Sequence, residues 1–283
     1  MSLQNINWYP GHMKKTRELI ASNLKLVDIV IEVIDARIPI SSRNPVIDEL
    51  TAGKQRIIIL NKSDLSDGQE NKRWIEKLSK DGSKVMTLDS MHGVGIKELL
   101  NLMSKIEDDI NKDRVRKKNL RLMIVGVPNV GKSSLINRLT GKKSAKTGDK
   151  PGVTKGKQWV KIRGDMELLD TPGILWPKFE DENVGIKLAF CGSIKDEILD
   201  LETLALRLIE LLQEEYPKLL ASRYKLEEIS DEGLENMDNI ALNRGFILSK
   251  GRIDYSRCAK TVLDEFRSAQ IGRITLERAK QDD

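Results

Sequence analysis

The stretch Gly126-Val-Pro-Asn-Val-Gly131-Lys132-Ser133 lies between an apolar run, residues 122–125, and a stretch with helical spacing, residues 134–139. It fits the pattern GxxxxGK[ST], and its setting between a strand and a helix is as informative as its letters. A loop at a helix N-terminus turns several backbone N–H groups toward one point, where the helix dipole also favours negative charge. The stretch therefore predicts a phosphate-binding loop in an α/β domain.

Each part of this loop has an expected role. Lys132 is expected to reach the β- and γ-phosphates of a nucleotide, and the Ser133 hydroxyl to ligate magnesium. The two glycines let the backbone approach phosphate oxygens closely. The predicted phosphate-contacting residues are Asn129, Val130, Gly131, Lys132, Ser133 and Ser134.

A second motif, Asp170-Thr-Pro-Gly173, follows a predicted strand at residues 166–169. A carboxylate at a strand end suits magnesium, usually through water, and the Gly173 N–H is expected to meet the γ-phosphate. Between the two motifs lies a glycine- and lysine-rich loop, residues 148–156. We choose Thr154 over Thr140 and Thr147 as a second magnesium hydroxyl, because the predicted hairpin begins just after it. The predicted metal ligands are Ser133, Thr154 and Asp170.

Asn61-Lys62-Ser63-Asp64 follows another apolar run, residues 56–60, and fits the pattern NKxD. An aspartate carboxylate can accept hydrogen bonds from both N1–H and the N2 amine of guanine, whereas adenine offers neither donor. Asn61 is expected to tie this base loop to the phosphate loop, and the stem of Lys62 to pack over the purine.

The tripeptide Asp89-Ser90-Met91 follows a predicted strand at residues 84–88. It is a further candidate for the base site, with backbone N–H groups and the Ser90 hydroxyl near guanine O6. An ordinary strand-to-helix turn explains the tripeptide almost as well. His92, next in the chain, has no evident partner and is expected to be structural.

Composition narrows the class of protein. The chain has 283 residues, of which 39% are hydrophobic and 32% charged, and a mean hydropathy of −0.39, as in a folded soluble protein. Two cysteines, Cys191 and Cys258, without a CxxC pair, argue against a disulfide framework or a cysteine zinc site. The first residues do not resemble a signal peptide and no apolar run is long enough for a membrane span. We expect a cytoplasmic protein without a membrane partner.

Basic residues are concentrated in segments. Residues 142–163 carry eight basic groups against Asp149, and residues 241–280 carry nine against four acidic ones. Residues 195–240 reverse the sign, with 13 acidic against 5 basic groups. Solvated faces explain any single run, but the sorted pattern indicates a polyanionic partner.

Short β-branched runs alternate with amphipathic ones up to about residue 180, and helical spacing alone follows. We predict a mostly parallel sheet with helices on both faces in residues 1–178, and a separate helical domain in residues 179–283. The last two strands are expected to form an antiparallel hairpin at the sheet edge. The expected strands are residues 28–34, 56–60, 84–88, 121–125, 158–162 and 166–169, and the expected helices are 71–79, 95–110, 133–139, 199–212, 230–244 and 257–268.

The order of the motifs is unusual, because NKxD precedes the phosphate loop instead of following it. This order resembles the circularly permuted Ras-like P-loop GTPases over essentially the whole chain. Within them, Trp8-Tyr-Pro-Gly-His12-Met13, Asp35-Ala-Arg37-Ile-Pro39 and the helical tail resemble the ribosome biogenesis GTPase A (YlqF) family. Two related permuted families carry a zinc-binding element or an N-terminal OB barrel. Membership of either family is disfavoured, because this chain has only two cysteines and its first strand comes early.

The resemblance implies a cytoplasmic GTPase that binds GTP and GDP with Mg²⁺ and acts late in assembly of the large ribosomal subunit. It implies weak intrinsic hydrolysis stimulated by ribosomal subunits, because Ile174 stands where Ras-like enzymes have a water-orienting glutamine. It also implies that Asn129 helps hold K⁺ and that His12 positions water. The expected catalytic residues are Lys132, Thr154, Gly173, His12 and Asn129.

Two other functions remain open at this point: a non-enzymatic RNA-binding module stabilised by guanine nucleotide, and a P-loop kinase or ATPase of another class. We expect a monomer that contacts rRNA and ribosomal proteins of the immature large subunit. The sequence does not identify which of them it contacts.

Overall fold

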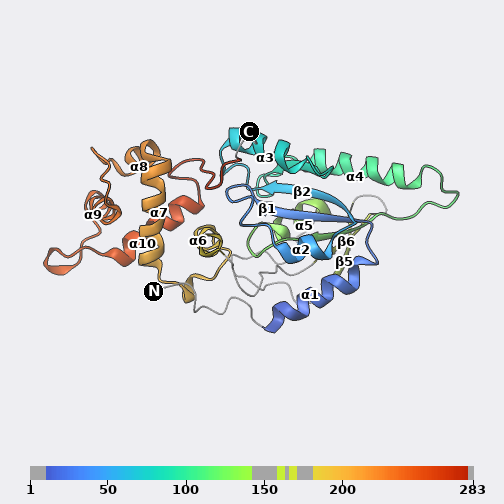
Figure 1. Ribbon diagram of the computed structural model, residues 1–283, viewed down its shortest axis with the longest axis horizontal. Helices are drawn as coiled ribbons and strands as arrows, with labels where there is room; N and C mark the ends of the chain where they lie inside the picture. The colour runs from blue at the N-terminus through green and yellow to red at the C-terminus, as the bar shows by residue number, and fades with distance from the viewer. Residues whose placement is uncertain (1–10, 142–157, 163–165, 171–180, 280–283) are drawn as a thin grey trace. The chain divides into compact units, whose positions relative to one another are not determined.

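The computed structural model describes residues 11–141, 158–162, 166–170 and 181–279, without the side chains of residues 11–16, 19, 158 and 170 (Figure 1). Among these residues, six strands form one sheet in the order β3-β2-β1-β4-β6-β5. β5 is antiparallel to β6 at the edge, and the other neighbouring strands pair in parallel. The strands are β1 (Ile29–Asp35), β2 (Gln55–Asn61), β3 (Lys84–Leu88), β4 (Arg121–Val125), β5 (Gln158–Lys161) and β6 (Glu167–Asp170).

Parallel pairing brings the carboxyl ends of the strands to one edge of the sheet. Asp35, at the end of β1, is in register with Asn61, at the end of β2, and Asn61 is in register with Leu88, at the end of β3. β4 ends beside the middle of β1, where Glu32 pairs with Val125. The loops after these four strands therefore begin close together, which is where ligands bind in open α/β sheets.

Helices flank this sheet (Figure 1). All seven residues of β1 are buried, as expected for a strand covered on both faces, and its β-branched run suits that position. Asp67 caps the N-terminus of α3, because its carboxylate accepts from the N–H groups of Gln69 and Glu70. The helices are α1 (Gly11–Leu24), α2 (Pro45–Leu50), α3 (Gly68–Leu78), α4 (Ile96–Asn111) and α5 (Lys132–Thr140).

The chain divides into two compact units. One contains the sheet and consists of the residues up to Gly185 together with those from Thr275 onward. The other runs from Ile186 to Ile274 and is helical, so it is an insertion connected to the first unit at both of its ends. The remaining helices are α6 (Glu182–Phe190), α7 (Leu201–Glu215), α8 (Pro217–Tyr224), α9 (Gly233–Arg244) and α10 (Tyr255–Arg267), with short 3-10 turns η2 (Asp196–Ile198) and η3 (Ser249–Gly251).

The helical unit has its own core. α7 packs against α8, α9 and α10, and buried apolar side chains line these contacts. The rings of Phe190 and Phe266 meet edge to face with centroids 6.5 Å apart. In the described part of the chain, no helix combines the length and the apolar character that a membrane span requires.

The sequence-based expectations for the fold are largely confirmed. All six expected strands and the edge hairpin are present, and the six expected helices correspond to α3, α4, α5, α7, α9 and α10. The sequence analysis did not anticipate α1, α2, α6 and α8. α2 and α8 each begin at a proline, Pro45 and Pro217, which fits the first position of a helix, but both are too short for a clear helical period.

Candidate nucleotide-binding site

The phosphate loop connects β4 to α5 and adopts a backbone that glycine makes possible. Gly126 has φ +150°, and a Cβ there would lie 2.3 Å from the carbonyl oxygen of Val33. Asn129 has φ +59° and Gly131 has φ +96°, so three residues of the loop lie in the positive-φ region. The β-strand beside the loop therefore excludes a side chain at Gly126 on steric grounds.

α5 begins directly at Lys132, and its N-cap residue is Gly131, which has no side chain with which to cap the helix. The first N–H groups of a helix have no partner within the helix, and in α5 they lie at the end of the phosphate loop. The Lys132 side chain is buried, and its Nζ donates to the carbonyl oxygen of Val127 at 2.7 Å. Ser133 and Ser134 follow in the first turn and are half-buried. This is the arrangement of donors that a phosphate group requires.

Asn61, at the end of β2, connects three loops. Its Nδ2 donates to the carbonyl oxygen of Val130 at 2.7 Å and to the Ser90 hydroxyl at 3.0 Å. Its Oδ1 accepts from the Ser90 N–H at 3.1 Å. The predicted tie between the base loop and the phosphate loop is therefore confirmed, and Ser90 belongs to the same buried network.

This network also explains Gly131. A Cβ at Gly131 would lie 2.2 Å from Asn61 Nδ2 and 3.1 Å from the Ser90 hydroxyl oxygen. Any side chain at that position would displace the amide that joins the loops. The second glycine of GxxxxGK is thus required by packing against the base loop as well as by its φ of +96°.

The loop after β3 is organised by Asp89, a residue to which the sequence analysis gave no separate role. Asp89 Oδ1 accepts from the N–H groups of Met91 and His92, both at 2.9 Å, and Oδ2 lies 2.6 Å from His92 Nδ1. The sequence indicated no partner for His92, which was expected to be structural, and in the structure Asp89 is its partner. Arg138, on α5, donates to the carbonyl oxygens of Ser90 and Met91.

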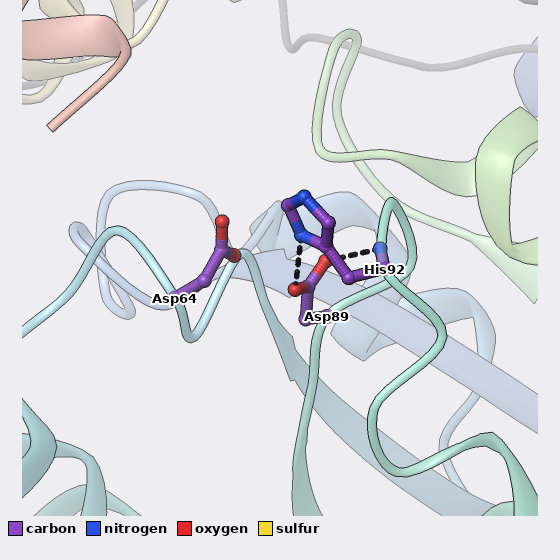
Figure 2. Close-up of side chains that lie close together, drawn as sticks. All are labelled: Asp64, Asp89 and His92. Atoms are coloured by element: carbon purple, nitrogen blue, oxygen red, sulfur yellow. Dashed lines mark hydrogen bonds and ion pairs between the residues drawn. The ribbon is translucent and has the colours of Figure 1, made fainter.

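Asp64 lies next to this loop (Figure 2). One ligating atom from each of Asp64, Asp89 and His92 falls within 4.8 Å of the others. Such a set could hold a metal ion, but the Asp89 carboxylate already accepts two backbone bonds and contacts the imidazole. The cluster lies where the loops after β2 and β3 come together, with Asp64 half-buried and Met91 two-thirds exposed.

The side chain of Lys62 is fixed by an ion pair with Asp35, the last residue of the neighbouring strand β1. Its Nζ lies 3.1 Å from Asp35 Oδ2, and Asp35 also accepts from Nε and Nη2 of Arg37 at 2.9 and 2.8 Å. Burial alone would raise the pKa of Asp35, but the charges of Arg37 and Lys62 outweigh it and hold this pKa well below its usual range. The carboxylate is therefore charged and buried, and it fixes the Lys62 side chain beside the base loop.

Known proteins resemble this chain over almost its full length. A family model described as "50S ribosome-binding GTPase" matches residues 121–240, and one described as "RsgA GTPase" matches residues 10–180. "Ribosome biogenesis GTPase A" of Bacillus cereus is 45% identical over 98% of this chain and 95% of its own length. That of Priestia megaterium is 46% identical over 96% of both chains. The chain belongs to the ribosome biogenesis GTPase A family.

Solved structures agree with this assignment to the ribosome biogenesis GTPase A family. GNP-bound YlqF from Thermotoga maritima superposes with a TM-score of 0.67 at 30% identity, covering 95% of this chain and all of that one. The chain is therefore a GTPase with a circularly permuted P-loop domain followed by a helical region. Its parallel sheet accommodates the permuted order because nucleotide sites form at strand ends, however the strands are connected.

Several candidate residues of this family member lie outside the described residues: Thr154 and Gly173 entirely, and Asp170 and His12 for their side chains. The backbone of Asp170 ends β6, and that of His12 lies in α1. The sequence analysis missed Arg138 and the role of Asp89, and it noted Asp35 and Arg37 only as part of a family resemblance. One signal could have identified Asp35. It is a carboxylate at the end of β1, and the strands on both sides of β1 end in the predicted phosphate and base loops.

Proposed function

We propose that this GTPase acts as a nucleotide-dependent switch in late assembly of the large ribosomal subunit, where it binds rRNA of the immature particle. The observation that best supports the nucleotide-binding part of this proposal is the buried Asn61 amide, which joins the base loop to the phosphate loop. The names of its relatives, "Ribosome biogenesis GTPase A", and the model description "50S ribosome-binding GTPase" support the ribosomal part.

In this proposal the nucleotide lies across the carboxyl edge of the sheet. Asp64 accepts from N1–H and N2 of guanine, the stem of Lys62 packs on the purine, and Ser90 and Met91 lie near O6. The N–H groups from Asn129 to Ser134 and the ammonium of Lys132 hold the phosphates. The position of the phosphate loop at the N-terminus of α5, where the N-cap residue is Gly131, supports this placement. The relatives' GTPase names disfavour both a non-enzymatic module and a kinase or ATPase of another class.

The magnesium site would be formed by Ser133, Thr154 and Asp170. The residues fit a hard cation, because Ser133 lies in the first turn of α5 directly after Lys132, and Asp170 ends the strand that pairs with β4. When bound, Mg²⁺ would neutralise charge on the β- and γ-phosphates. In the same proposal Gly173 donates to the γ-phosphate, Asn129 helps hold K⁺ beside the phosphates and His12 positions the attacking water.

Weak intrinsic hydrolysis follows from Ile174, since an aliphatic side chain cannot orient water. Ribosomal subunits would then supply the stimulation. We further propose that residues 1–178 form the GTPase domain and that residues 179–283 carry the ribosome-binding region, within the helical unit Ile186–Ile274, in a monomeric, cytoplasmic protein.

The helical unit offers a refined candidate for the RNA contact. Other arginines of this unit are engaged in ion pairs: Arg223 and Arg244 with Glu265, Arg207 with Glu210 and Arg267 with Asp196. By contrast, Lys250 and Arg252 are exposed at the turn around η3, next to exposed Ile247 and Leu248. We therefore propose that this turn, residues 247–252, contacts rRNA phosphates.

Cosedimentation with ribosomal subunits tests the proposal. The full-length chain is mixed with immature and mature large subunits under GDP or a non-hydrolysable GTP analogue, across a series of salt concentrations. We expect tighter binding with the analogue and a steep loss with salt, because phosphate contacts release counterions. Lys132→Ala is the control, which should bind equally in both nucleotides. Equal affinity of the unaltered chain in GDP and analogue would contradict the switch.

A further inference from the structure

The C-terminal tail, defined here as residues 275–279, returns from the helical unit to the unit that contains the sheet (Figure 1). Alternate residues of the tail are buried there: Thr275 is 1% exposed, and Glu277 and Ala279 are each 8% exposed, whereas Arg278 is exposed. Ala279 joins a core cluster formed by β1, β2 and α3, together with Ile34, Leu60 and Trp74. A charged residue in such a position requires partners.

Glu277 finds those partners in the loop that follows β1. Its Oε2 accepts from the Ile40 N–H at 2.6 Å, and both carboxylate oxygens accept from the Ser41 N–H, at 3.1 and 3.2 Å. The Ser41 hydroxyl donates to the same carboxylate. Glu277 thus satisfies a run of backbone donors and fixes residues 40 and 41.

The neighbouring backbone of the tail reaches Arg37. The Leu276 N–H donates to the carbonyl oxygen of Arg37 at 2.8 Å. Arg37 in turn pairs with Asp35, and Asp35 pairs with Lys62 of the base loop. A continuous chain of buried contacts therefore leads from the tail to the NKxD motif.

The tail also touches the segment on the other side of Asp64. The Thr275 hydroxyl accepts from the Asp67 N–H at 3.0 Å, three residues after Asp64. Trp74 Nε1, on α3, donates to the Glu277 carbonyl oxygen at 2.7 Å, and the Ala279 N–H donates to Glu70 at 3.0 Å. Residues 61–67 are thereby held at both ends by contacts that lead to the tail.

We propose that Thr275 and Glu277 are positioning residues for guanine recognition: the tail holds the base loop so that Asp64 meets the purine edge. This inference rests on the guanine-binding role proposed for Asp64. In this proposal the tail acts through the base loop and not by touching the nucleotide. Its loss should therefore weaken the base contacts more than the phosphate contacts.

The test compares affinities for GDP and IDP, measured by titration calorimetry on full-length chains. Hypoxanthine lacks the N2 amine, so the ratio of the two affinities reports how well the Asp64 carboxylate is placed. We expect Glu277→Ala and Thr275→Val each to lower the ratio of GDP affinity to IDP affinity about threefold or more. A loss of this size corresponds to a weakened hydrogen bond between the Asp64 carboxylate and the N2 amine. Glu277→Gln keeps one acceptor oxygen and should restore part of the ratio. Glu228→Ala, an exposed glutamate of the helical unit, should leave it unchanged.

Thermal unfolding of each variant separates positioning from general destabilisation, since loss of stability alone lowers both affinities together. If Glu277→Ala does not fold, Thr275→Val decides, because it removes one hydroxyl and keeps the shape. An unchanged ratio in the folded variants would overturn the proposal. Asp64→Asn serves as the reference: if it leaves the ratio unchanged as well, the guanine role of Asp64 itself is wrong.

Discussion

The side-chain nitrogen of Asn61 lies 2.7 Å from the carbonyl oxygen of Val130, although 69 positions separate the two residues in the chain. The contact is possible because β2 and β4 both flank β1 in one parallel sheet, so their loops leave the same edge. The order in which the chain visits the strands has no effect on this geometry. Circular permutation has therefore preserved the contact between the two loops.

Removing that amide should loosen the site. Asn61→Ala deletes the bonds to Val130 and Ser90 and leaves their polar groups unpaired in a buried region. We expect GDP affinity to fall by about 10- to 100-fold, measured by fluorescence titration. Asn101→Ala, on an exposed position of α4, is the control. An affinity equal to that of the unaltered chain would show that the tie has no part in binding.

Gly131 should be intolerant of any side chain. Gly131 and Gly141 both have positive φ, so alanine strains either backbone by about 1 kcal/mol. The added Cβ at Gly131 would meet Asn61 and Ser90, whereas none of the described residues has an atom within 4 Å of a Cβ at Gly141. Gly131→Ala should therefore lose GDP binding while Gly141→Ala keeps it at similar cost in thermal stability. Equal loss in both variants would indicate that backbone strain alone is responsible.

Sequence reasoning captured what local patterns encode. The strands, the edge hairpin and the motifs at strand ends each have a composition or spacing of their own, and the Asn61 tie followed from two motifs in one sheet. The partners of Asp89 and Asp35 could not be derived, because a carboxylate in a turn has the same pattern whether it caps N–H groups or binds a ligand. Nothing in residues 275–279 indicated that the chain returns to the first unit, since that contact depends on tertiary structure alone.

The buried carboxyl of Glu32 makes a prediction about how the stability of the chain depends on pH. It is buried in the middle of β1, with Arg43 and Arg56 each 3.6 Å away, and neither of its oxygens has a hydrogen-bond partner among the described residues. Burial raises its pKa more than Arg43 and Arg56 lower it. A carboxyl whose pKa is raised on folding contributes most to stability below its ordinary pKa and loses that contribution as pH rises through the folded value.

Glu32→Gln should therefore be more stable than the unaltered chain at pH 7, by about 1.4 kcal/mol for each unit by which the pKa is raised. The advantage should shrink as pH falls through 4.5, the ordinary pKa of glutamate, and vanish below it, where Glu32 is neutral in both the folded and the unfolded chain. Calorimetric unfolding over this range measures it, with Glu76→Gln on the exposed face of α3 as control. A variant that is less stable at neutral pH would show that the two arginines outweigh burial.

The turn at residues 247–252 can be tested by charge reversal. Lys250→Glu with Arg252→Glu replaces two exposed positive charges, neither of which has an ion pair among the described residues. We expect large-subunit binding to weaken by at least about tenfold and its salt dependence to become shallower, because fewer phosphates are contacted. GDP affinity should be unchanged. Unaltered ribosome binding would place the RNA contact elsewhere.

The central claim is that the NKxD loop and the phosphate loop grip one guanine nucleotide, with Asp64 at the base edge. The most direct measurement is the affinity of Asp64→Asn for GDP and for XDP, because an amide matches the C2 carbonyl of xanthine and opposes the N2 amine of guanine. We predict that this variant prefers XDP, whereas the unaltered chain prefers GDP, by about 100-fold or more in each case. An Asp64→Asn chain that still prefers GDP would contradict the account.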